Sequence, residues 1–154
     1  MNKFMKEAIK EAEKGIAKGH GGPFGCVIVK DGKIIGRGHN TVVLDNDPTC
    51  HGEMSAIRNA CKNLKSFDLS GADLYTTGMP CPMCICAMLW ANIDHLYYGA
   101  TVEENASIGF RDEIFRDNMS ISLDKMADKI TQLDHDECMK VLKKYDEMQD
   151  KTLY

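Results

Sequence analysis

Cys50-His51-Gly52-Glu53 and Pro80-Cys81-Pro82-Met83-Cys84 are the two stretches around which the chain is organised, and together they read H-x-E followed by P-C-x-x-C. Imidazole nitrogen and thiolate sulfur are zinc ligands, and a catalytic zinc keeps one tetrahedral position for water. The pattern therefore predicts a Zn²⁺ site whose three protein ligands are His51, Cys81 and Cys84. The carboxylate of Glu53, which is not needed as a ligand, would carry protons beside the water in the remaining position.

The spacing within each stretch fits the start of a helix. Cys81 and Cys84 are three residues apart, which places both thiols on one side of a helical turn. At a helix N-terminus the macrodipole and the free N–H groups favour anionic sulfur. His51 and Glu53 are two residues apart, and they can converge above a first turn because side chains lean toward the N-terminal end. We therefore expect two helix N-termini that face each other across a metal ion.

Other interpretations of the cysteines are open. A C-x-x-C pair alone is also typical of a structural zinc half-site or a redox pair. Cys50 or Cys86 would close the zinc shell if either were a fourth protein ligand, although Cys86 points elsewhere on a helix and both fit the role of small buried hydrophobes. A zinc-stabilised binding module without turnover would use the same three ligands and would not depend on Glu53.

Composition limits the class of protein. The chain has 154 residues, which suits one domain over residues 1–154, and its 44% hydrophobic and 27% charged residues are typical of a folded globular protein. The net charge of −4 and the lack of a basic stripe argue against a nucleic-acid partner. Seven cysteines without a secretory leader indicate free thiols in the reducing cytoplasm, and no stretch predicts a membrane span. Four histidines have no ligand-like spacing and should face solvent or be satisfied locally: His20, His39, His95 and His135.

Hydrophobic periodicity predicts alternating helices and strands. We expect helices over 3–18, 49–64, from 81 or 82 onward, and 136–148, with 104–115 helical or irregular. We expect strands over 24–29, 34–41, 72–77, 95–99 and 130–133, and a loop over 45–48. The Asp31-Gly32 turn joins the first two strands into a hairpin. This order predicts an α/β fold, a three-layer α/β/α sandwich with a mixed central sheet.

At these residues the chain resembles the cytidine-deaminase-like superfamily over most of its length, and within it the bacterial guanine deaminases. Four features carry the second resemblance: Gly21-Gly22-Pro23-Phe24-Gly25, Asn46-Asp47-Pro48-Thr49, Gly109-Phe110-Arg111-Asp112 and the terminal Tyr154. The first two are shared in part with transfer-RNA adenosine deaminases. The resemblance implies zinc-dependent hydrolytic deamination of a nucleobase, guanine to xanthine and ammonia, with cytosine or transfer-RNA adenosine as the alternative substrate.

The resemblance also implies the substrate-binding residues. Asn40 would hydrogen-bond the purine, Phe24 would line the pocket, and the backbone N–H of Gly52 would donate to a substrate acceptor. Asp112 would accept N–H protons from guanine, and Tyr154 would close the site. The family further implies a homodimer that exchanges C-terminal segments, so that Asp112 or Tyr154 acts in the partner's site.

Several features depart from the guanine deaminase pattern. Gly52 stands where alanine is usual, and Arg111 stands where an acidic residue is expected. His-Gly-Glu, together with Gly38-His39-Asn40, is similar to the fungal type of cytosine deaminase. These departures concern which base is bound, whereas the residues of the reaction itself are retained.

Overall fold

The computed structural model describes residues 1–119 and 129–151. The elements follow one another in this order: α1 (Lys3–Ala17), β1 (Gly25–Lys30), β2 (Lys33–His39), α2 (Val42–Asp45), α3 (Gly52–Leu64), β3 (Ala72–Gly78), α4 (Pro82–Trp90), β4 (His95–Ala100), α5 (Val102–Ser107), α6 (Glu113–Met119), β5 (Ile130–Gln132) and α7 (His135–Asp146). Within these residues no helix is long and apolar enough to cross a membrane.

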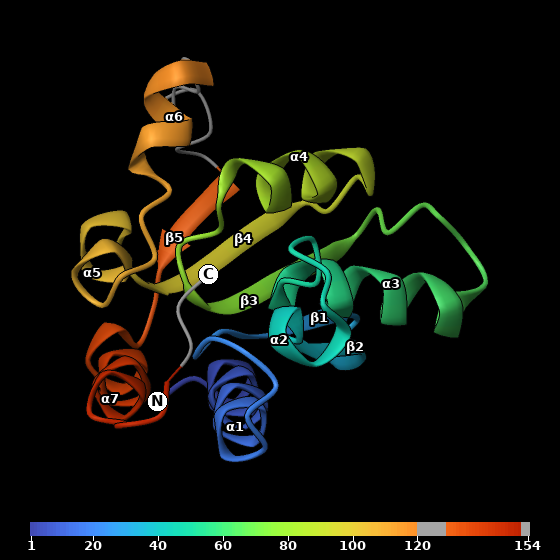
Figure 1. Cartoon of the computed structure of the whole chain (residues 1–154). Coiled ribbons are helices and arrows are strands. Elements are labelled where there is room, and N and C mark those ends of the chain that lie inside the picture. The colour runs from blue at the N-terminus through green and yellow to red at the C-terminus, as the bar shows by residue number, and fades with distance from the viewer. Residues whose placement is uncertain (120–128, 152–154) are drawn as a thin grey trace.

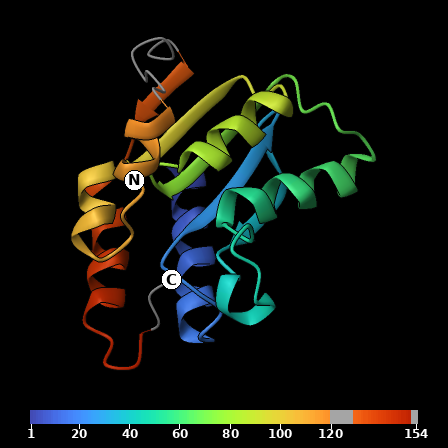
Figure 2. The same cartoon turned by 45° about the horizontal axis from the view of Figure 1, so that its top comes forward.

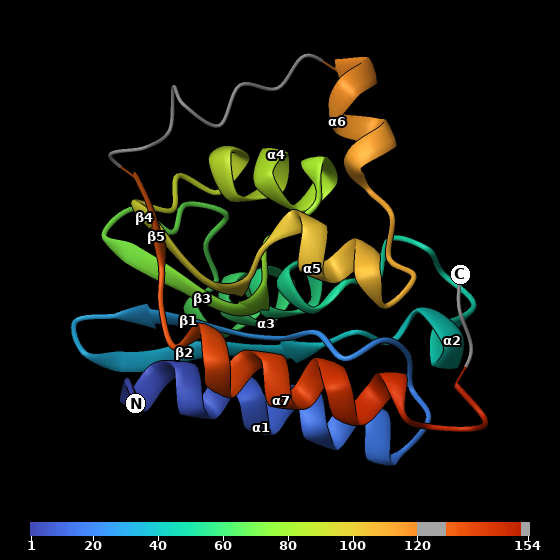
Figure 3. The same ribbon diagram turned by 90° about the vertical axis from the view of Figure 1, so that its left-hand side faces the viewer.

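The predicted three-layer architecture is confirmed. The strands form one sheet in the order β2-β1-β3-β4-β5, and they pair antiparallel on either side of β1 and parallel from β3 to β5. Helices α1 and α7 cover one face of this mixed sheet, and α3 and α4 cover the other (Figure 1). Figure 3 shows the layers edge-on, with the sheet between the two helical layers.

The strand sequences explain why both faces are covered. Successive side chains of a strand point to opposite faces. In β1, Cys26 and Ile28 therefore pack into the core under α3 and α4, whereas Val27 and Val29 pack into the core under α1. Because both sets are apolar and buried, the strand reads as a continuous hydrophobic run, as expected for a strand between two helical layers.

Helix α3 lies unusually close to β2. A Cβ atom added at Gly36 would come within 2.5 Å of the Ala56 carbonyl oxygen, and one added at Gly38 would come within 2.4 Å of the Ala56 nitrogen. Only glycine permits this approach. The contact fixes the N-terminal end of α3 beside the end of β2.

Two predicted boundaries were wrong. The strand expected over 34–41 ends at His39, because the Asn40 side chain accepts the Val42 N–H at 3.1 Å and the chain turns into α2. The helix expected from residue 49 begins at Gly52, because Asp47 accepts the Thr49 N–H at 2.8 Å and holds the preceding residues in a turn. The segment expected to be helical or irregular over 104–115 contains the later part of α5, which begins at Val102, and the start of α6, separated by a loop.

Candidate active site

The site lies at the edge of the sheet where β3 ends. The antiparallel register places Gly25 opposite His39 and Cys26 opposite Thr76. The residues that follow β2, precede β1 and follow β3 therefore meet at one edge. Figure 2 shows the N-terminal ends of α3 and α4 beside each other above this edge.

The two helix starts present the predicted ligands. His51 is the N-cap of α3 and Cys81 is the N-cap of α4, both in extended backbone conformation, and neither side chain caps its own helix. Pro82 occupies the first turn of α4, where its missing N–H costs nothing. The imidazole of His51 and the thiol of Cys81 are thus free for another partner.

The three side chains converge as a zinc site requires. His51 Nδ1 lies 3.6 Å from Cys81 Sγ and 3.7 Å from Cys84 Sγ, and the two sulfur atoms are 3.7 Å apart. In a tetrahedron, Zn–S bonds of about 2.3 Å and Zn–N bonds of about 2.0 Å imply S–S separations of about 3.8 Å and S–N separations of about 3.5 Å. The donor set and its spacing therefore fit Zn²⁺. Among the described residues this is the group of His, Cys, Asp or Glu side chains arranged to hold a metal.

Neither alternative fourth ligand reaches the cluster. Cys50 Sγ instead accepts a hydrogen bond from Arg58 Nη1 at 3.8 Å, and Cys86 lies outside the group. All seven cysteines are free thiols. One corner of the tetrahedron is therefore without a protein ligand among the described side chains, as a catalytic site needs.

The thiols and the imidazole influence one another electrostatically. The hydrogen bond from Cys84 lowers the pKa of Cys81 to about 4, and that bond together with burial raises the pKa of Cys84. Burial acts to lower the pKa of His51, but its hydrogen bond with Cys81 and the nearby negative charges outweigh burial and raise it. Of the two thiols, Cys81 therefore forms a thiolate readily, and this thiolate favours the protonated form of the neighbouring His51.

Glu53 lies next to the cluster and is 4% exposed. Thr76 Oγ1 donates to Glu53 Oε1 at 2.7 Å, and Glu53 Oε2 lies 3.4 Å from Cys84 Sγ. Burial raises the pKa of Glu53 although His51 and Thr76 act in the opposite direction. A carboxyl group with a raised pKa and one oxygen anchored is suited to receive and return a proton.

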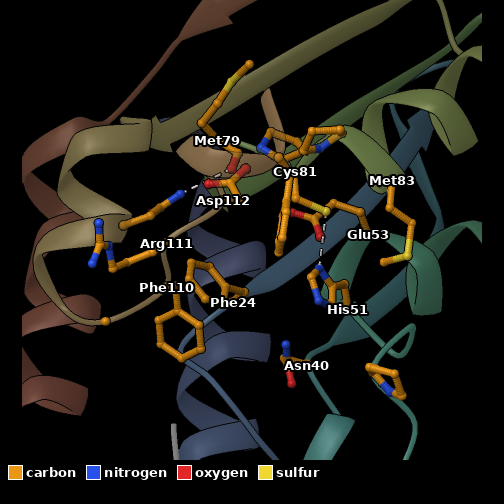
Figure 4. A pocket seen from close by; sticks show the side chains of 16 residues that line it. Phe24, Asn40, His51, Glu53, Met79, Cys81, Met83, Phe110, Arg111 and Asp112 are labelled. Carbon is orange, nitrogen blue, oxygen red and sulfur yellow. Dashed lines mark hydrogen bonds between the residues drawn. The ribbon is translucent and has the colours of Figure 1, made fainter. Parts of the chain in front are cut away.

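A cavity of about 540 Å³ opens in front of these groups (Figure 4). Phe24 and Phe110 form an aromatic wall, with ring centroids 4.9 Å apart and planes at 85°. Asn40 is buried, and because its Oδ1 accepts the Val42 N–H, its Nδ2 is the group left for a ligand. Asp112 lines the cavity near Cys81 and Met79 (Figure 4). Burial raises the pKa of Asp112, and Arg116 opposes this effect.

The remaining predicted site residues have different outcomes. Gly52 is buried and is not among the residues that line the cavity, and a Cβ added there would lie 2.9 Å from the Phe24 carbonyl oxygen. Tyr154 lies outside the described residues. The four histidines without ligand spacing are paired locally, as expected: His20 with His39 at 2.9 Å, His39 with Glu11 at 3.2 Å, His95 with Thr131 at 2.8 Å, and His135 with Asp136 at 2.9 Å.

Several residues that line the pocket were not predicted as site residues, and Phe110 and Asn105 make the contacts that matter most. Phe110 belongs to the quoted Gly-Phe-Arg-Asp segment, but only Asp112 of that segment was assigned a role. Asn105 is buried, and its Nδ2 donates to the Met79 carbonyl at 3.1 Å. Nothing in its sequence neighbourhood signals this contact, which joins α5 to the turn after β3.

Comparisons with known proteins agree with this geometry. The family described as "Cytidine and deoxycytidylate deaminase zinc-binding region" matches residues 1–100. Guanine deaminase of Bacillus subtilis is 45% identical over 129 residues, which cover 83% of this chain and 80% of that protein. A tRNA-specific adenosine deaminase of Streptococcus pyogenes is 44% identical over 113 residues, which cover 73% of this chain and 69% of that protein.

A solved structure extends the likeness to the whole chain. The crystal structure of Bacillus subtilis guanine deaminase superimposes with a TM-score of 0.75 at 38% identity, and it covers 100% of this chain and 99% of the other. The family match covers residues 1–100, and one relative is 45% identical. Together with the geometry of the two helix starts, these matches show that this chain belongs to the cytidine and deoxycytidylate deaminase family and is a deaminase.

Proposed function

We propose that this deaminase converts guanine and water to xanthine and ammonia. The observation that carries the proposal is the end-to-end correspondence with Bacillus subtilis guanine deaminase, which continues past the family's zinc-binding region. Residues beyond 100 supply Phe110 and Asp112 to the pocket. The likeness to the adenosine deaminase covers a smaller share of both proteins, and the charge of −4 does not favour a transfer RNA.

The metal would be Zn²⁺, held by His51, Cys81 and Cys84. A zinc ion at such a site lowers the pKa of a coordinated water and makes it a nucleophile at neutral pH. The fit of the three donor atoms to tetrahedral spacing supports this assignment.

Glu53 would move the protons. With Oε1 held by Thr76, the other oxygen, Oε2, is the one that takes a proton from the attacking water. Attack is at C2 of guanine. Glu53 would then deliver the proton to ring N3, take the second proton from the attacking oxygen and pass it to the departing amine, so that the carbonyl of xanthine forms as ammonia leaves.

The pocket would orient the base. Phe24 and Phe110 provide an aromatic wall against which the base would pack, and the Nδ2 of Asn40 would donate to a purine acceptor. The backbone N–H of Gly52, at the start of α3, offers a second donor, since helix N-termini carry free N–H groups. Asp112 accepts from the ring N–H next to C2, and Tyr154 closes the site from the C-terminal segment.

The assembly would be a homodimer in the cytoplasm, with C-terminal segments exchanged and a role in purine catabolism. The outer side of α4 supports a partner, because Trp90 is 86% exposed and Leu89 beside it is also exposed. The seven free thiols suit a reducing compartment. Sedimentation of the purified protein tests the dimer, which a single monomeric species would exclude.

A substrate panel tests the reaction. Purified zinc-loaded protein is incubated with guanine, cytosine, adenine and their nucleosides, and ammonia is measured. We expect release from guanine, with xanthine as product. Ammonia from another base but none from guanine would overturn the choice of substrate, and retained turnover in Glu53→Gln would overturn the mechanism.

A further inference from the structure

We propose that Arg116 is a positioning residue that holds Asp112 as a fixed hydrogen-bond acceptor for the ring N–H beside the reacting carbon, and so selects guanine. The inference rests on the proposed function. It concerns a residue outside the motifs of the sequence, one turn into α6. Its guanidinium group makes contacts with Asp112 and with the Pro80 carbonyl.

The first contacts are with Asp112 itself. Arg116 Nε and Nη2 lie 3.1 Å and 2.9 Å from Asp112 Oδ2. Both N–H groups meet the same oxygen, so the arginine does not take up Oδ1. The backbone reinforces this orientation, because the Arg116 N–H donates to the Asp112 carbonyl at 3.2 Å. Asp112 thus lines the pocket with one carboxylate oxygen fixed and the other left for a ligand.

The ion pair between Arg116 and Asp112 is buried, which strengthens its effect on the hydrogen-bonding role of Asp112. The side chains of Arg116 and Asp112 are only 10% and 14% exposed. An ionised carboxylate only accepts hydrogen bonds, whereas a protonated one also donates. Burial raises the pKa of Asp112, and the adjacent guanidinium opposes this effect and so favours the accepting form of the carboxylate.

An obligate acceptor at this place distinguishes the bases. In guanine the reacting C2 has N3 on one side and the N1–H donor on the other. In cytosine and adenine the reacting carbon has a ring nitrogen on one side and a carbon on the other. A group that must accept a hydrogen bond is therefore satisfied by guanine alone among the three, and a site built for a substrate N–H rejects analogues that lack it.

The third contact of the guanidinium group links Arg116 and Asp112 to the turn that carries the predicted zinc ligand Cys81. Arg116 Nη2 also donates to the carbonyl of Pro80, the residue before Cys81. The same turn is held by the Met79 N–H, which donates to the Ala100 carbonyl at 2.7 Å, and by Asn105. Arg116 thus fixes Asp112 relative to the turn that carries a zinc ligand.

The arginine is not fully satisfied by these bonds. Its Nη1 is buried without a hydrogen-bond partner among the described residues. Buried ion pairs are weak evidence for stability, and an unpaired buried donor calls for another explanation. The burial of this arginine is therefore better explained by its Nε and Nη2 contacts, which orient Asp112, than by a gain in stability.

The test compares Arg116→Gln and Arg116→Lys with the original protein and with Arg37→Gln. Arg37 is the matched control, since it pairs with Glu7 at 2.9 Å on the outer strand β2, away from the pocket. The KM and kcat for guanine are measured together with zinc content and melting temperature. The inhibition constant of 2-aminopurine, which keeps the 2-amino group but has an acceptor at N1, is measured as a second probe.

We expect Arg116→Gln to raise KM for guanine by about tenfold or more, since a site that loses a buried charge partner binds the matching donor poorly. The kcat should stay within about threefold, because the interaction is equally present in ground and transition states. The inhibition constant of 2-aminopurine should not rise, because this analogue has no N1–H donor for Asp112 to accept. The zinc content and the Arg37→Gln values should not change. Arg116→Lys, which keeps the charge without the fork, should recover part of the loss, and it carries the test if the glutamine variant does not fold.

An unchanged KM in an active, zinc-loaded Arg116→Gln would overturn the role of Arg116 alone. Equal losses for guanine and 2-aminopurine would do the same, because they would indicate a general distortion of the pocket. The unmodified protein tests the underlying activity separately, since absence of guanine turnover there would overturn the proposed function and with it the acceptor role.

Discussion

Replacing Thr76 with valine should lower kcat while leaving KM and zinc binding in place. Valine has nearly the same shape, so the change removes the hydroxyl that donates to Glu53 Oε1 at 2.7 Å in a fully buried position. A hydrogen bond to a charged group contributes about 1.5–3 kcal/mol. Because about 1.4 kcal/mol corresponds to a factor of ten in rate, kcat should fall by about 10- to 150-fold if that bond holds Glu53 in its working orientation.

The neighbouring Thr77 provides the control. It is equally buried but points to the opposite face of the sheet, where its Oγ1 donates to the Pro23 carbonyl at 3.3 Å and accepts the Gly25 N–H at 3.1 Å. Thr77→Val therefore loses a buried hydroxyl without touching Glu53. The assay is steady-state ammonia release from guanine, with zinc measured in each sample. Equal losses of kcat in the two variants, or a Thr76→Val kcat within about twofold of the original, would refute the reasoning.

Three further outcomes are expected. Glu53→Gln should retain zinc and lose about 100-fold or more of its turnover, because an amide cannot accept the water proton; metal analysis and ammonia release measure the two effects. Cys81→Ala should lose zinc and melt at a lower temperature, since metal binding and folding are coupled; a variant that still holds stoichiometric zinc would contradict the ligand set. Hydrogen bonds to Asp136 and Glu104 raise the pKa of His135, so its stabilising effect is complete below the unfolded value of about 6.5 and is lost as pH rises through the folded value. His135→Gln should therefore melt slightly below the original protein at pH 5.5 and level with it at pH 9, and a constant difference between the two pH values would argue against the ion pair.

Local sequence patterns were sufficient to predict the three zinc ligands and the helices that carry them. Ligand spacing, the proline at the start of α4 and the period-two pattern of the strands act over a few residues, so they can be read along the chain. The same holds for α5, whose Thr101 and Glu104 form a capping box that starts the helix at Val102. That signal was present, but our expectation began the segment at residue 104.

The contacts that complete the pocket could not be read in this way. Arg116 reaches a carbonyl 36 positions away along the chain, and Asn105 reaches one 26 positions away. Both depend on how α5 and α6 pack over the turn after β3, which no spacing rule encodes. Phe110 was visible in a quoted segment, but its pairing with Phe24 required the fold to bring two distant loops together.

The close packing of α3 against β2 determines which substitutions in β2 this protein can tolerate. Gly36 and Gly38 touch neither the pocket nor the predicted zinc ligands, yet they act as the stop against which the helix carrying His51 rests. Any side chain at either position would wedge the helix outward and carry the imidazole away from the two sulfur atoms. Substitution of either glycine should thus disturb the predicted zinc site from outside the cavity, and a survey of variants confined to the residues that line the cavity would miss this effect.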